Sequence, residues 1–183
     1  MKTASSITAM VSARLCAACG MCCDGVLFHS VELQKEDSPR QLASLGLKLR
    51  RKKGVEFFLQ PCSMHREIGG SCSCVIYDQR PARCRLFNCK QLLAVTDGRS
   101  TEAAALENIR TARARVNRVL SLMAQVGETN PNRSLAHRVA NALTLPPNTE
   151  RTLLHNQLET AMRELEALLD QEFRVDGIKS ATP

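Results

Sequence analysis

Nine cysteines, all in the first half of the chain, constrain this sequence more than any other feature. Four of them lie within eight residues, in the segment CAACGMCC that runs from Cys16 to Cys23. A thiolate is a high-affinity ligand for zinc and iron, and thiols two residues apart can bind one ion from a single tight turn. A disulfide scaffold requires an oxidising compartment and ordinarily an even number of cysteines. The sequence therefore favours metal binding.

The length of 183 residues, of which 44% are apolar, suffices for one medium domain or two small ones. No stretch approaches the roughly 20 apolar residues that cross a bilayer. The N-terminal segment also lacks the continuous apolar region of a secretory signal. We therefore expect a cytoplasmic protein that has no membrane partner.

The formal net charge of +7 would ordinarily indicate nucleic acid or another anionic partner. Metal-bound thiols are deprotonated, however, and two divalent ions held by eight thiolates would contribute −4 and lower the balance to +3. One tyrosine and no tryptophan leave few platforms on which bases could stack. A zinc-dependent nucleic-acid-binding module is an alternative that rests on net charge alone, and we do not expect nucleic acid as a partner.

Short elements are predicted between the cysteine groups. Apolar and β-branched residues favour a strand within 26–33. A serine followed by a proline is typical of a helix start, which predicts a short helix over 38–46 that ends at a glycine. Two alternating segments around a glycine-containing turn predict a β-hairpin within 47–60. Its second strand would bring Cys62 to the metal region.

After Cys89 the composition changes, because cysteine disappears and helical periodicity takes over. We place a domain boundary near Gly98, so that residues 1–97 form a cysteine-rich module and residues 98–183 a helical segment. Apolar residues at steps of three and four predict helices over 101–126, 131–145 and 154–168. Their apolar faces would pack on one another or on the module, with a protein partner or a homodimer interface as the alternative. The predicted fold class is α+β: a small irregular module with a β-hairpin and short helices, followed by three helices.

The cysteine doublet in CAACGMCC indicates more than one ion. Cys16, Cys19 and Cys22 repeat at steps of three, and Cys23 follows directly. Adjacent side chains project in different directions, so Cys22 and Cys23 do not close a small chelate on one tetrahedral ion. The doublet therefore implies two metals or a cluster, and later cysteines must supply the remaining ligands from distant loops.

The cysteine pattern extends to QPC, which ends at Cys62, and to CVIYDQRPARCRLFNC, from Cys74 to Cys89. Together with CAACGMCC, these segments resemble the CxxCxxCC family of bacterial proteins described as zinc or iron chelators, also called YkgJ-like cysteine-cluster proteins. The resemblance covers residues 16–95. It implies metal chelation, without a defined biochemical role, by Cys16, Cys19, Cys22, Cys23, Cys62, Cys74, Cys84 and Cys89. The ninth cysteine, Cys72, is not required by the family pattern and is kept as a further candidate ligand.

The resemblance does not name the metal, and the ligand count leaves three arrangements open. Eight thiolates suit two tetrahedral zinc sites of four cysteines each. All nine could instead form a three-zinc cluster with six terminal and three bridging sulfurs. Three close cysteines and a remote fourth can also hold a [4Fe-4S] cluster, in which Cys62 or Cys84 would be the fourth ligand.

No paired carboxylates, nucleophile elbow, phosphate loop or dinucleotide fingerprint indicates a defined reaction. Cys84, between Arg83 and Arg85, has the surroundings of an activated thiolate, but the same cations suit a metal ligand. His65 follows Cys62 at Cys-x-x-His spacing, and we interpret it as a solvated loop residue. We expect a noncatalytic metal-binding protein. The competing hypothesis is an iron-sulfur protein that transfers electrons or assists a modifying enzyme.

Overall fold

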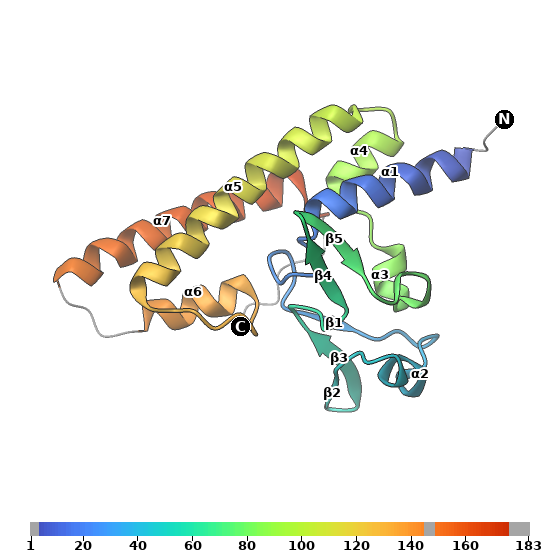
Figure 1. The fold of residues 1–183 in the computed structure, drawn as a ribbon, viewed down its shortest axis with the longest axis horizontal. Coiled ribbons are helices and arrows are strands. Elements are labelled where there is room, and N and C mark those ends of the chain that lie inside the picture. Colours follow the sequence, from blue (N-terminus) through green and yellow to red (C-terminus); the bar gives the residue numbers. More distant parts are fainter. Residues whose placement is uncertain (1–3, 145–148, 176–183) are drawn as a thin grey trace.

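The computed structural model describes residues 4–144 and 149–175 and has the predicted α+β fold (Figure 1). Within these residues there are seven α-helices and two small antiparallel sheets. The helices are α1 (Ala4–Cys19), α2 (Pro39–Ser44), α3 (Ala82–Leu86), α4 (Lys90–Thr96), α5 (Glu102–Val126), α6 (Leu135–Leu143) and α7 (Thr149–Glu172). The strands are β1 (Ser30–Glu32), β2 (Leu49–Lys52), β3 (Val55–Leu59), β4 (His65–Ile68) and β5 (Ser71–Cys74).

The first element, α1, is a helix of 16 residues. Cys16 and Cys19 lie in its last turn, so this pair projects from the end of a helix. The next residue, Gly20, has a φ of 63°, in the left-handed region that glycine adopts without steric cost. A Cβ atom at this position would lie 2.4 Å from Cys72 Sγ. The turn that leads to the cysteine doublet therefore requires glycine.

The predicted hairpin is present as β2 and β3, joined by Lys53 and Gly54, which both have positive φ. β1 pairs with the other edge of β3, which gives the antiparallel order β1-β3-β2. The strand expected within 26–33 is shorter than predicted, because only Ser30–Glu32 pair. The predicted short helix is α2, with Ser38 at its N-cap. The buried core of this part consists of Leu42, Leu47, Phe58, Met64 and Ile76.

A second hairpin, formed by β4 and β5, was not predicted. Its sequences HREI and SCSC lack the alternation of apolar and polar residues that indicates a half-buried strand. Gly69 and Gly70, with φ of 59° and 77°, form its turn. Cys72 and Cys74 are two residues apart on β5, so their side chains project from the same face of the hairpin.

The long helices α5 and α7 lie side by side and form the arm on the left of Figure 1. α5 matches the helix predicted over 101–126. Thr101 caps its N-terminus by accepting a hydrogen bond from the Ala104 amide, and Gly127 ends it in the left-handed conformation. Its buried residues recur at steps of three and four, as predicted: Ala105, Ile109, Ala112, Val116, Val119, Leu122, Met123 and Val126.

The start predicted for α6 is wrong by four residues. The helix begins at Leu135, because the preceding segment forms a turn in which Asn130 Oδ1 accepts a hydrogen bond from the Asn132 amide. The proline pair 146–147, which was expected to end the helix, lies outside the described residues. α6 packs against both α5 and α7.

One apolar cluster joins the cysteine-rich part to the helical arm. Leu15, Met21 and Leu27 are buried together with the apolar faces of α5, α6 and α7. Backbone hydrogen bonds also cross between the two parts, from the Leu135 amide to the Gly25 carbonyl and from the Lys90 amide to the Phe173 carbonyl. The helices therefore pack on the module, while the domain division at 97/98 stays a prediction. None of the described helices combines the length and the apolar character needed to cross a bilayer.

Candidate metal centre

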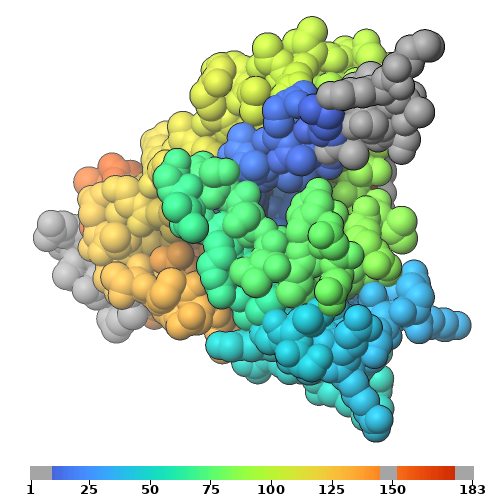
Figure 2. All heavy atoms as spheres, turned by 45° about the vertical axis from the view of Figure 1, so that its right-hand side comes forward, coloured from blue at the N-terminus to red at the C-terminus, as the bar shows by residue number. Residues whose placement is uncertain are grey.

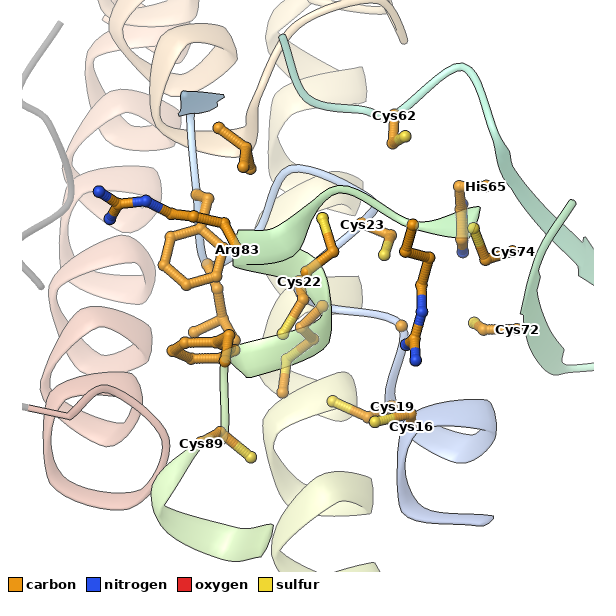
Figure 3. Close-up of a pocket in the computed structure, with 18 of the residues that line it drawn as sticks. Cys16, Cys19, Cys22, Cys23, Cys62, His65, Cys72, Cys74, Arg83 and Cys89 are labelled. Carbon is orange, nitrogen blue, oxygen red and sulfur yellow. The ribbon is translucent and has the colours of Figure 1, made fainter. Parts of the chain in front are cut away.

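A cavity of about 590 Å³ lies among α1, the β4–β5 hairpin and the α3–α4 segment, and all nine cysteines line it. Figure 2 shows the hollowed face on which the blue end of α1 meets the green segments that follow β3. Figure 3 shows the thiols projecting into the cavity from these elements. All nine are free of disulfide bonds. The fold thus gathers cysteines that are far apart in the sequence.

The first group consists of four cysteines from α1, the turn after it and the start of α4. Cys22 is within electrostatic range of Cys19, Cys89 and Cys16 as well as of its neighbour Cys23, and Cys19 interacts in turn with Cys89 and Cys16. Cys89 occupies the N-cap position of α4. We call Cys16, Cys19, Cys22 and Cys89 the first group. The sequence left Cys62 and Cys84 as candidates for the fourth partner of the CxxCxxC run, whereas Cys89 lies beside that run in the structure.

The second group surrounds the other member of the doublet. Cys23 is within electrostatic range of Cys62, Cys74 and Cys84, and Cys84 interacts in turn with Cys62 and Cys74. The Cys62 amide donates a 2.8 Å hydrogen bond to the Cys23 carbonyl, which fixes the loop after β3 beside the doublet. We call Cys23, Cys62, Cys74 and Cys84 the second group. Beyond each other, Cys22 and Cys23 therefore interact with different thiols, while the prediction that they bind separate ions stays a prediction.

Burial makes several of these thiols weaker acids than a free cysteine. Burial, with the neighbouring thiols, raises the pKa of Cys19 and of Cys84 to about 12. The same causes raise the pKa of Cys22 and Cys23 well above the ordinary value. Four acidic groups around one point cannot all ionise without a counter-charge. A divalent ion supplies that counter-charge and replaces the protons.

Backbone amides are aimed at three of the sulfurs. The Met64 amide donates to Cys62 Sγ at 3.4 Å, and the His65 amide also points at this sulfur. The Leu92 and Gln91 amides, in the first turn of α4, are directed toward Cys89 Sγ, and the Met21 amide is directed toward Cys19 Sγ. These bonds lower the pKa of each thiol against the larger effect of burial, because they favour the thiolate. Such donors are the partners that orient and stabilise metal-bound thiolates.

Arg80 stands at the rim of the cavity. Its guanidinium lies 3.6 Å from the centroid of the Tyr77 ring, so the arginine is held in place by a cation–π contact. Its charge interacts with Cys16 and Cys84, one from each group. For Cys84 the effect of burial on the pKa is larger, and Arg80 opposes it. The rim therefore provides positive charge next to both groups.

Cys72 lies outside both groups. After burial, the groups that shift its pKa are Arg113, Glu67 and Asp24. Arg113 Nη2 is 4.0 Å from Cys72 Sγ, and Arg113 also donates hydrogen bonds to Asp24 and to the Cys19 carbonyl. Cys72 therefore packs over the turn at Gly20, among charged side chains.

His65 was misinterpreted from the sequence as a solvated loop residue. It is half-buried on β4, directly opposite Cys74 on β5, and it lines the same cavity as the thiols. Its Nε2 atom is buried and has no hydrogen-bond partner. Only the Cys-x-x-His spacing after Cys62 could have indicated this placement, and that spacing alone does not distinguish a ligand from a surface residue.

Across residues 4–144 and 149–175, no three side chains of His, Cys, Asp or Glu stand close enough together to hold an ion as placed. Metal binding therefore requires the sulfurs of each group to lose their protons and move toward a common point. The donor set fits such an ion, because each group offers four soft sulfur ligands and the backbone already directs amides at several of them.

The fold and the cavity define an α+β protein with a cysteine-lined centre suited to zinc or iron. The model of the CxxCxxCC family, described as a putative zinc- or iron-chelating domain, matches residues 15–110. The chain belongs to this family, as the sequence resemblance indicated, and the family supports metal binding as its function. No curated protein and no solved structure matches the chain.

Proposed function

We propose that the protein binds two zinc ions, one in each cysteine group, and that the ions stabilise the fold without taking part in catalysis. The observation that carries the proposal is the separation of the cysteine doublet. Cys22 faces the first group and Cys23 the second, so adjacent residues serve two centres. Four thiolates are the usual ligand set of a closed structural zinc site.

The positions of the ligands support a structural role. The first group connects α1 to α4, and the residue after Cys89 bonds to the Phe173 carbonyl at the end of α7. The second group connects the doublet to the loop after β3, to β5 and to α3. An ion in each group would therefore fix segments that the small apolar core of the module holds together weakly. A cytoplasmic location fits nine unpaired thiols.

A three-zinc cluster of all nine cysteines has less support. Such a cluster needs three bridging sulfurs and therefore continuous contact among all the thiols. Cys72 instead interacts with Arg113, Glu67 and Asp24. Its placement favours eight sulfur ligands over nine.

The first group also supports a second candidate function. Cys16, Cys19 and Cys22 with the remote Cys89 form three close cysteines and a distant fourth, a ligand arrangement that holds [4Fe-4S] clusters. A cluster there would make the protein an electron carrier or an accessory of a modifying enzyme. Its position near the exposed Cys16 would leave it accessible to a redox partner.

Purification without oxygen, followed by elemental analysis and a visible absorption spectrum, distinguishes these functions. Two zinc ions per chain in a colourless protein would support the structural sites. A brown protein that contains iron and sulfide would support the cluster and contradict the zinc proposal. A protein that binds neither metal after anaerobic reconstitution would contradict both.

A further inference from the structure

We propose that His65 is a metal ligand of the second group, so that the ion there is bound by the imidazole Nε2 and three thiolates. The ion of the first group is bound by sulfur alone. This inference rests on the proposed function and adds to it, because it makes the two sites chemically different. The added ligand, His65, lies outside the cysteine pattern of the sequence.

The hairpin places His65 against the second group. Residues directly opposite each other on antiparallel strands project from the same face, and His65 is opposite Cys74. The His65 amide donates a 3.0 Å hydrogen bond to the Cys62 carbonyl and also points at the sulfur of that residue. Figure 3 shows the imidazole beside Cys74, within the cavity that the thiols line. His65 is thus fixed by its backbone between two members of the second group.

The imidazole lacks a partner that its burial requires. Nε2 has no hydrogen-bond partner among the described residues, although it is shielded from solvent. A buried nitrogen without a partner costs about 1–3 kcal/mol and is rare in native proteins. Neutral imidazole is a common zinc ligand and joins cysteines in many tetrahedral sites. An ion at the second group would give Nε2 the partner that it lacks.

The other histidine at this cavity is already engaged. The ring of His29 stacks on that of His137 with 4.0 Å between centroids, and its Nδ1 lies 3.4 Å from Ser134 Oγ. His155 on α7 also has a buried Nε2 without a partner, but it does not line the cavity. His155 therefore offers a matched control for the loss of a half-buried imidazole.

The donor count of the second group changes accordingly. Five donors, four thiols and one imidazole, are available for the four positions of a tetrahedral ion. One thiol of the group would stay outside the coordination sphere, in addition to Cys72. The ion and its ligands together would carry one negative charge less than an all-sulfur site, since imidazole is neutral.

Cadmium-113 NMR of the full-length protein tests the inference. The protein is loaded with two equivalents of cadmium-113 and labelled with nitrogen-15 in histidine. We expect two cadmium resonances, of which one, at the position of a mixed sulfur and nitrogen site, is split by coupling to one imidazole nitrogen. In H65Q the splitting is lost and that resonance alone moves. In H155Q both resonances are unchanged.

Two results would overturn the inference. Two resonances at all-sulfur positions, with no coupling to histidine in the unmodified protein, would leave the proposed metal binding intact and exclude His65 as a ligand. A protein that takes up no cadmium would contradict the proposed function itself. The coupling is measured on the unmodified chain, so the test does not depend on whether H65Q folds.

Discussion

Arg113, in the middle of α5, forms an ion pair with Asp24, the residue that follows the cysteine doublet, with 2.5 Å between Nη1 and Oδ2. Both side chains are partly buried. The same guanidinium donates to the Cys19 carbonyl, while Asp24 Oδ1 accepts a hydrogen bond from the Val26 amide. One side chain of the helical arm therefore holds both ends of the turn that presents Cys22 and Cys23.

Replacement of Arg113 by glutamine should destabilise the protein by about 2 kcal/mol, because it leaves the partly buried Asp24 carboxylate without its counter-charge. We also expect weaker binding of both ions, since the turn between the two groups loses its support. Urea unfolding of the zinc-loaded protein and a competition assay with a zinc indicator measure the two effects.

Arg110 is the control for this substitution. It lies one turn earlier on the same helix and forms an exposed ion pair with Glu107. Arg110→Gln should change the free energy of unfolding by less than about 0.5 kcal/mol, as for most exposed pairs. Equal effects of the two substitutions on the free energy of unfolding would show that the contact of Arg113 with the cysteine turn stabilises the protein no more than an exposed ion pair does.

Replacement of Cys89 by serine should remove one of the two ions. The first group has no spare donor within its four cysteines, and a serine hydroxyl is a poor zinc ligand at neutral pH. The loss should also loosen the helical arm, because the next residue bonds to the end of α7. Elemental analysis gives the stoichiometry, and hydrogen exchange of α4 and α7 gives the local effect. Retention of two ions would remove Cys89 from the first group.

The pH dependence of stability should differ in direction between the metal-free and the zinc-loaded protein. In the metal-free protein the pKa of Cys19 and of Cys84 is about 12, above the ordinary value of 9.0. Between pH 9.0 and about pH 12, the folded state therefore keeps protons on these thiols that the unfolded chain releases. Its free energy of unfolding should fall by about 1.4 kcal/mol per pH unit for each such thiol as pH rises above 9.

In the zinc-loaded protein the thiols are ionised, so their effective pKa lies below that of the unfolded chain. Its stability should persist at alkaline pH and be lost on acidification, when protons displace the ions. Thermal unfolding of both forms from pH 5 to pH 11 tests this. Parallel pH profiles would contradict thiolate coordination.

The sequence predicted elements whose signals are local. The cap at Thr101, the glycine at 127 and the spacing between them define α5, and the turn at Gly54 defines the first hairpin. That Cys22 and Cys23 do not share one ion stays a prediction, which rests on the geometry of adjacent side chains. The family that the cysteine pattern indicated was confirmed over residues 15–110.

The partners of these cysteines were not predictable, because they depend on contacts between distant segments. Cys89 joins the first group because the end of α7 and the network of Gln91 with Glu172 and Asn108 hold α4 in place. The placement of His65 likewise depends on the β4–β5 hairpin, whose polar sequence gives no strand signal. Short-range patterns do not specify the partners of Cys89, and for His65 they offer only its spacing from Cys62.

Replacement of Cys72 by serine decides whether this residue is a metal ligand. Cys72 is only partly buried, and its sulfur lies 4.0 Å from Arg113 Nη2, beside Glu67 and Asp24. Serine is smaller and polar, so it fits among these charged groups, and we expect a change in stability of less than about 1 kcal/mol. Both zinc ions should be retained, because neither group loses a donor.

A nine-sulfur cluster would respond in the opposite way. Every sulfur in it completes at least one tetrahedron, so the loss of Cys72 would leave an ion with three ligands and lower the metal content. Elemental analysis of Cys72→Ser and Cys89→Ser, prepared in parallel, separates the two arrangements, because both substitutions remove one thiol from the same cavity. We expect two ions in the first variant and one in the second. Loss of an ion from Cys72→Ser would exclude two independent groups and establish a shared cluster that includes this residue.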